Sequence, residues 1–200
     1  WEPERLRNVS FNVSHHGDWV VFVGNTSPES SVQLGIDTMD FQEQVSGELF
    51  EAFSTCYRDQ FTENEIAFMK DAPLDLEAPS STNNSMRRFY RMWCLKEAMV
   101  KSLGIGIDFN LKSFEFVIQD TEEGTEPILT TTLRILEPSS MHLKDGWCFE
   151  EALLDNDHCY AIAARVETED NDSVMDGTEI MQFDWQRLLR DAVPYPPQFT

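Results

Sequence analysis

Residues 91–104, RMWCLKEAMVKSLG, constrain the fold most strongly, because they predict a long amphipathic helix that needs a surface to pack against. We expect this helix to run from about residue 86 to residue 103, with Ser85 as its N-cap and Gly104 ending it. The apolar side of the helix is expected to comprise Phe89, Met92, Met99, Val100 and Leu103.

The other side of this helix carries a stripe of spaced polar and aromatic residues. Trp93, Glu97 and Lys101 lie four residues apart, so a helix places them in one row. Lys96 lies beside Glu97. Taken alone, this pattern fits either a solvated Glu–Lys pair or a carboxylate flanked by two ammonium groups at a functional site.

The remaining sequence predicts strands and two further helices. Residues 9–24 have the pattern of a β-hairpin, residues 32–37 that of a buried strand, and residues 112–119, 128–136, 147–154 and 158–166 that of four further strands. Residues 48–61 repeat aromatic side chains at helical spacing, and Thr62 with Glu65 forms a capping-box pattern that starts a second, short helix. We therefore predict an α+β fold, with a mostly antiparallel sheet packed against the long helix.

We expect three segments along the chain. Residues 1–166 form the folded domain, residues 167–180 read as an acidic linker, and residues 181–200 read as a tail that docks on the core, with a short helix starting at Asp184. The opening residues read as an entry in the middle of a longer protein, because neither an initiator methionine nor a signal-peptide pattern is present.

The charge balance limits the classes of partner. With 36 acidic and 15 basic residues the net charge is −21, which argues against binding to nucleic acid or to an anionic membrane. The four cysteines show no CxxC spacing, so a zinc site is not expected. Reduced thiols point to a cytoplasmic protein.

Two further features carry candidate chemistry. Asp37 closes an apolar strand, where it is either a ligand-binding carboxylate or a turn residue. Ser14 and His15 lie in the stretch NVSHHGD, which we interpret as a turn whose hydroxyl, imidazole and backbone N–H groups either hold a phosphate or serve ordinary turn chemistry. Two carboxylates, Asp37 and Glu97, suit Mg²⁺, which needs only one or two protein carboxylates besides phosphate oxygens and water.

Taken in order, FNVSHHGDW, LGID and FYRMWCLKEAMVKSLGIG resemble the signatures of the 4′-phosphopantetheinyl transferases, especially the long, two-lobed eukaryotic type that serves aminoadipate-semialdehyde dehydrogenase and fatty acid synthase. The resemblance covers most of residues 9–166 and matches the second lobe and the junction. It implies a Mg²⁺-dependent enzyme, monomeric at full length, that transfers the phosphopantetheine arm of coenzyme A to a serine of an apo carrier protein. It also implies catalytic roles for Glu97 and Lys101, with Asp37 and Glu97 binding the metal. The coenzyme-binding residues implied by the resemblance are Asn12, Val13, Ser14, His15, Asp37, Lys96, Glu97 and Lys101.

Two departures from the family pattern bear on this interpretation. Met39 stands where many bacterial members have a third acidic metal ligand, so water or a side chain near His16 is expected there, with Asp40 in the wrong register. The first lobe, with its basic coenzyme-binding residues, is not matched. The alternative is therefore a non-catalytic module that binds carrier proteins, or an inactive half-enzyme of the same fold.

Overall fold

A computed structural model describes residues 9–25, 32–41, 55–71, 84–106, 109–119, 130–143, 145–166, 181–183 and 190. The strands are β1 (Ser10–His16), β2 (Trp19–Asn25), β3 (Val32–Asp40), β4 (Phe114–Gln119), β5 (Thr130–Ile135), β6 (Trp147–Leu153) and β7 (His158–Val166). The helices are α2 (Glu63–Lys70) and α3 (Asn84–Leu103), with 3₁₀ turns η2 (Leu111–Ser113) and η3 (Pro138–Leu143). The α+β class is confirmed.

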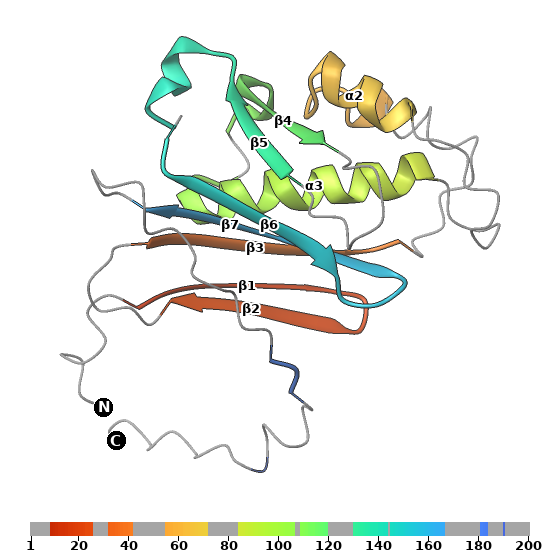
Figure 1. Ribbon diagram of the computed structural model, residues 1–200, viewed down its shortest axis with the longest axis vertical. Helices are drawn as coiled ribbons and strands as arrows, with labels where there is room; N and C mark the ends of the chain where they lie inside the picture. The colour runs from red at the N-terminus through yellow and green to blue at the C-terminus, as the bar shows by residue number, and fades with distance from the viewer. Residues whose placement is uncertain are drawn as a thin grey trace, which may run out of the picture.

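All strand pairs in the described part of the chain are antiparallel, as predicted, but they form three sheets where the sequence predicts one. β1 pairs with β2, β4 pairs with β5, and β7 lies between β3 and β6. Figure 1 shows α3 between the β3–β7–β6 sheet on one side and α2, β4 and β5 on the other, with the β1–β2 hairpin beyond β3. The long helix thus lies at the centre of the fold.

Helix α3 forms the main core because its apolar side packs on both neighbours. The largest buried cluster includes Phe89, Met92, Leu95 and Met99 of α3 together with residues of β4 and β7. A second cluster on the other face of the central sheet joins the hairpin to it, and its buried members are Val21, Ile36, Tyr160 and Ile162. The charged positions of α3 are therefore held between packed layers, where small shifts are costly.

The element boundaries test several predictions. The capping box is confirmed: the Thr62 side chain accepts the Glu65 N–H, and the Glu65 carboxylate accepts the Thr62 N–H. Gly104 follows α3 with φ of 65°, as a C-terminal stop requires. Ser85 as N-cap is wrong, because Asn84 before it is already helical. β3 continues to Asp40, so Asp37 lies within the strand and does not end it.

Other predictions fall outside the described residues. These are the linker at residues 167–180, nearly all of the tail with its helix from Asp184, and the first half of the helix at residues 48–61. In the second half, residues 55–56 are helical and residues 57–60 form a turn. Within the described residues, no helix combines the length and apolar character of a membrane span.

Candidate functional site

Asp37 points from the middle of β3 toward α3. Side chains alternate along a strand, so Gly35 and Asp37 share the face that α3 covers, while Ile36 belongs to the cluster on the other face. In register, Asp37 lies opposite Ala161 of β7. The strand therefore carries a carboxylate into the layer between sheet and helix, where only 6% of the residue is exposed.

Two side chains converge on one oxygen of this carboxylate. Lys101 of α3 donates to Asp37 Oδ1 at 2.6 Å, and the Ser14 hydroxyl of β1 donates to the same atom at 2.7 Å. Lys101 also donates to Ser14 Oγ at 2.9 Å and to the carbonyl of Ile36 at 3.2 Å. The structure thus brings Ser14, Asp37 and Lys101, residues of three separate elements, into one cluster.

Glu97 borders this cluster. It is partly buried, and burial raises the pKa of its carboxyl group above 4.5. The negative charge of Asp37 raises the pKa further, and the ammonium of Lys101 lowers it. The charge of Asp37 therefore acts on Glu97 and disfavours a second negative charge, which is the electrostatic setting of a cation site or a proton acceptor.

The donor set fits Mg²⁺ better than a softer metal. The site offers the carboxylates of Asp37 and Glu97, whose charges interact, and the described residues hold no group of three or more His, Cys, Asp or Glu side chains able to bind a metal. Both contacts of Asp37 fall on Oδ1, and within the described part of the chain Oδ2 accepts no hydrogen bond. Asp37 and Glu97 would hold the ion, with phosphate oxygens and water completing its shell.

The structure places Lys96 elsewhere, which corrects its predicted role in phosphate binding. Its side chain is 0% exposed, and its ammonium lies 2.9 Å from the carboxylate of Glu65. The same ammonium donates to the carbonyls of Leu111 at 2.7 Å and Phe114 at 3.3 Å. Because the side chain is fully buried together with these partners, a coenzyme phosphate cannot reach the ammonium. We interpret Lys96 as the partner of the capping-box carboxylate.

The coenzyme-binding turn predicted at residues 12–15 is a strand. These residues lie in β1, and the hairpin turns at Gly17 and Asp18, where Gly17 has φ of 53°. Alternation splits the predicted set: Ser14 is buried toward β3, whereas Val13 and His15 are exposed on the opposite face. Only the outer residues of this set are open to a ligand without rearrangement of the cluster.

The polar residues of the inner face of β1 bind β3 instead of a ligand. The Asn12 side chain accepts the Ile36 N–H at 3.3 Å, and His16 Nδ1 accepts the Asp40 N–H at 2.7 Å. Together with Ser14, they form a row of alternate side chains that fastens the hairpin to the edge of β3. The alternation N-x-S-x-H was the sequence signal for this role, and the interpretation as a turn missed it.

Met39 occupies the position at which many bacterial family members have a third acidic ligand. Met39 packs, partly buried, against the main core, and Asp40 directs a carboxylate oxygen to 3.5 Å from His158 Nε2. His16, near which a substitute side chain was expected, accepts the Asp40 N–H through Nδ1.

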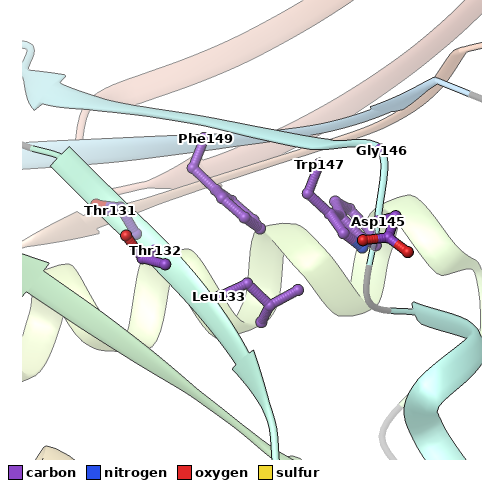
Figure 2. Close-up of a pocket in the computed structure, with 7 residues that line it drawn as sticks. All are labelled: Thr131, Thr132, Leu133, Asp145, Gly146, Trp147 and Phe149. Atoms are coloured by element: carbon purple, nitrogen blue, oxygen red, sulfur yellow. The ribbon is translucent and has the colours of Figure 1, made fainter. Parts of the chain in front are cut away.

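An open cavity lies away from this cluster. It has a volume of about 260 Å³ and is lined by Thr131, Thr132, Leu133, Asp145, Gly146, Trp147 and Phe149. Figure 2 shows it between β5 and β6, with Leu133, Trp147 and Phe149 pointing into it. β7 separates β6 from β3 in the central sheet, so the cavity and Asp37 lie at opposite edges of that sheet. The cavity is therefore not part of the carboxylate site.

Comparison with known proteins agrees with this geometry. Residues 33–163 match the family model described as the 4′-phosphopantetheinyl transferase superfamily. The chain is similar to a phosphopantetheinyl transferase of Thraustochytrium sp., with 31% identity over 90% of this chain and 54% of that protein. It is also similar to the L-aminoadipate-semialdehyde dehydrogenase-phosphopantetheinyl transferases of Xenopus laevis (36% identity, 77% of this chain, 46% of that protein) and Homo sapiens (29%, 96% and 60%).

The chain thus spans about half the length of the curated relatives that it matches. Among solved structures, it is similar to a holo-(acyl-carrier-protein) synthase from Bacillus anthracis in complex with coenzyme A (3′,5′-ADP), at 19% identity and a TM-score of 0.36 over 68% of this chain and 96% of that one. The family match includes Asp37, Glu97 and Lys101. The chain belongs to the 4′-phosphopantetheinyl transferase superfamily.

Proposed function

We propose that this protein transfers the 4′-phosphopantetheine group of coenzyme A to a serine of an apo carrier protein, releasing adenosine 3′,5′-bisphosphate. The observation that carries the proposal is the convergence of Asp37, Lys101 and Ser14 beside the partly buried Glu97. These groups come from β1, β3 and α3, three elements that are separate in the sequence.

Each group has a role in the proposed reaction. Glu97 accepts the proton of the carrier serine, directly or through water, because its raised pKa makes the carboxylate a better base than an exposed one. The serine oxygen forms a bond to the phosphorus of the phosphopantetheine arm, and the bond from that phosphorus to the adenosine bisphosphate oxygen breaks. Lys101, whose side chain is 29% exposed, neutralises charge on the phosphates. Bound Mg²⁺ supplies further neutralisation of the pyrophosphate charge.

Ser14, His15 and Lys96 have different parts in the proposed site. Ser14 fixes Asp37 Oδ1, and the exposed His15 on the outer face of β1 is open to a phosphate of the coenzyme. Lys96 contributes through the core and not through the substrate.

The test is transfer to defined carriers. Purified protein, coenzyme A and Mg²⁺ are incubated with the apo carrier domains of an aminoadipate-semialdehyde dehydrogenase and of a fatty acid synthase, and mass spectrometry follows the carrier serine. We expect a mass gain of one phosphopantetheine, abolished in Glu97→Gln and strongly slowed in Asp37→Asn. Failure of every carrier to gain mass contradicts the proposal.

A second function has one observation in its favour. The chain spans about half the length of its curated relatives, so the alternative is a non-catalytic module that binds carrier proteins, or an inactive half-enzyme of the same fold. Calorimetric titration of coenzyme A with and without Mg²⁺ separates the two. Transfer requires Mg²⁺-dependent binding of the coenzyme, whereas carrier binding that needs neither Mg²⁺ nor coenzyme identifies the non-catalytic module.

A further inference from the structure

At Gly35, β3 and α3 approach so closely that no room is left for a side chain. A Cβ atom built at Gly35 would lie 1.8 Å from the carbonyl oxygen of Ala98 and 2.6 Å from the backbone nitrogen of Ser102. Real Cβ atoms essentially never come within 3.0 Å of such atoms. Both neighbours are backbone of the helix, so no rotamer change relieves the overlap, and either the helix or the strand has to move.

The residues opposite β3 are also small. Ala163 pairs with Gly35 and Ala161 pairs with Asp37, and both are fully buried in the core cluster that includes α3. Ala98 on the helix is likewise fully buried. A glycine inside a strand marks a place where another backbone approaches closely. The helix backbone thus packs against a surface of small residues on the sheet.

This contact lies next to the proposed site on both the strand and the helix. On β3, Asp37 follows Gly35 by two residues and shares its face. On α3, the two contacted residues, Ala98 and Ser102, each directly follow a site residue, since Glu97 precedes Ala98 and Lys101 precedes Ser102. The backbone contact at Gly35 therefore sets the distance of Glu97 and Lys101 from the Asp37 carboxylate.

We propose that Gly35 is a positioning residue that sets the β3–α3 spacing at which Asp37 and Glu97 share a divalent cation and Lys101 reaches Asp37. This inference rests on the proposed function. The contact at 1.8 Å falls 1.2 Å short of the 3.0 Å limit, so any side chain at this position forces the helix and strand apart by about that amount. Mg²⁺ demands near-ideal octahedral geometry, and a misplacement of about 1 Å costs on the order of 100-fold in rate.

The primary variant is Gly35→Ala, measured against Gly24→Ala as a matched control. Gly24 also lies in a strand, but the atoms within 3.4 Å of its added Cβ belong to the exposed Phe22 ring, which can turn away. Binding of Mn²⁺ in the presence of coenzyme A, followed by calorimetry, reports the metal site without requiring turnover. We expect Gly35→Ala to weaken Mn²⁺ binding about tenfold or more, corresponding to about 1.4 kcal/mol, and to lower kcat/KM about 100-fold, with Gly24→Ala unchanged in both.

A second substitution distinguishes spacing from stability. Asp37→Glu lengthens the carboxylate by one methylene group, so at the native spacing it should weaken Mn²⁺ binding, whereas in the Gly35→Ala background it should recover part of the lost binding. Unchanged Mn²⁺ affinity in folded Gly35→Ala, or additive losses in the double variant, overturns the proposal. If Gly35→Ala does not fold, Asp37→Glu alone decides: a metal affinity within about twofold of wild type overturns it, and a loss of about tenfold or more supports it.

These readouts also separate the inference from the proposed function. A wild-type protein that binds Mn²⁺ and coenzyme A but modifies no carrier contradicts the transfer reaction and leaves the spacing measurable. A wild-type protein that transfers phosphopantetheine while Gly35→Ala retains full metal affinity supports the reaction and contradicts the role of Gly35.

Discussion

Replacing Lys96 by methionine separates a structural role for this residue from a role in phosphate binding. Methionine keeps most of the volume but removes the ammonium, so the carboxylate of Glu65 stays buried with only the backbone N–H groups of Thr62 and Phe116 as partners. The carbonyl of Leu111 also loses its donor. Breaking a buried pair from one side costs about 3–5 kcal/mol, a large share of the roughly 5–15 kcal/mol that stabilises a domain.

The pH dependence of this loss has a definite sign. Burial raises the pKa of Glu65 above 4.5, and Lys96 opposes that shift, so the substitution raises the pKa further. A group with a raised folded-state pKa contributes stability that is present below its unfolded pKa and is lost as the pH rises through the folded value. The difference between Lys96→Met and wild type should therefore be smaller near pH 5 than near pH 8.

The assay is urea unfolding followed by circular dichroism at both pH values, with the affinity for coenzyme A measured on folded protein. Arg58→Met is the matched control, because its pair with Glu63 is exposed and should contribute less than about 1 kcal/mol. Adding Glu65→Gln to Lys96→Met should restore part of the stability by removing the unpaired charge. A loss below about 1 kcal/mol, or a tenfold weaker coenzyme affinity in folded Lys96→Met, refutes the structural assignment.

Three further outcomes follow from the same contacts. In Asp37→Asn, the pKa of Glu97 should fall, because the negative charge that raises it is removed. Activity rises along the acidic limb of the pH–rate profile as Glu97 loses its proton, so this limb should move to lower pH. The measurement is the pH dependence of the activity that the variant retains. Ser14→Ala should lower stability by about 1 kcal/mol in thermal unfolding and weaken Mn²⁺ binding, because Asp37 loses a hydrogen bond that orients it. Gly17→Ala should destabilise the hairpin by about 1–2 kcal/mol, since φ is 53° and the new Cβ would lie 2.6 Å from His158 Nε2; an unchanged melting temperature contradicts this.

The sequence predicted the local features best. Hydrophobic period located α3 and the strands, and the Thr62–Glu65 spacing located the start of α2, because these signals depend on neighbouring residues. It could not place Lys96, since a lysine next to a site glutamate looks the same whether it turns to solvent or into the core. Its partner Glu65 is 31 positions away in the chain, and only packing brings the two together.

The same limit explains the errors around Asp37 and Ser14. An acid after an apolar run resembles a strand end, but antiparallel pairing with β7 continues to Asp40. The polar residues Asn12, Ser14 and His16 resemble a turn, but their alternation reflects a strand whose inner face bonds to a neighbour. In both places, contacts with residues distant in the sequence determined the local structure. The family resemblance pointed to Asp37 and Lys101 but did not describe the contacts that hold them.

The attachment of β1 to β3 through side chains has a consequence for the solution behaviour of the protein. A strand edge with free N–H groups is a template for pairing with other chains, and here Asn12 and His16 occupy the Ile36 and Asp40 N–H groups on the side of β3 away from β7. Substituting these residues would uncover that edge while leaving the ladder to β7 intact. The same row of residues that includes Ser14, the hydrogen-bond donor to Asp37, thus also protects the protein against edge-to-edge aggregation.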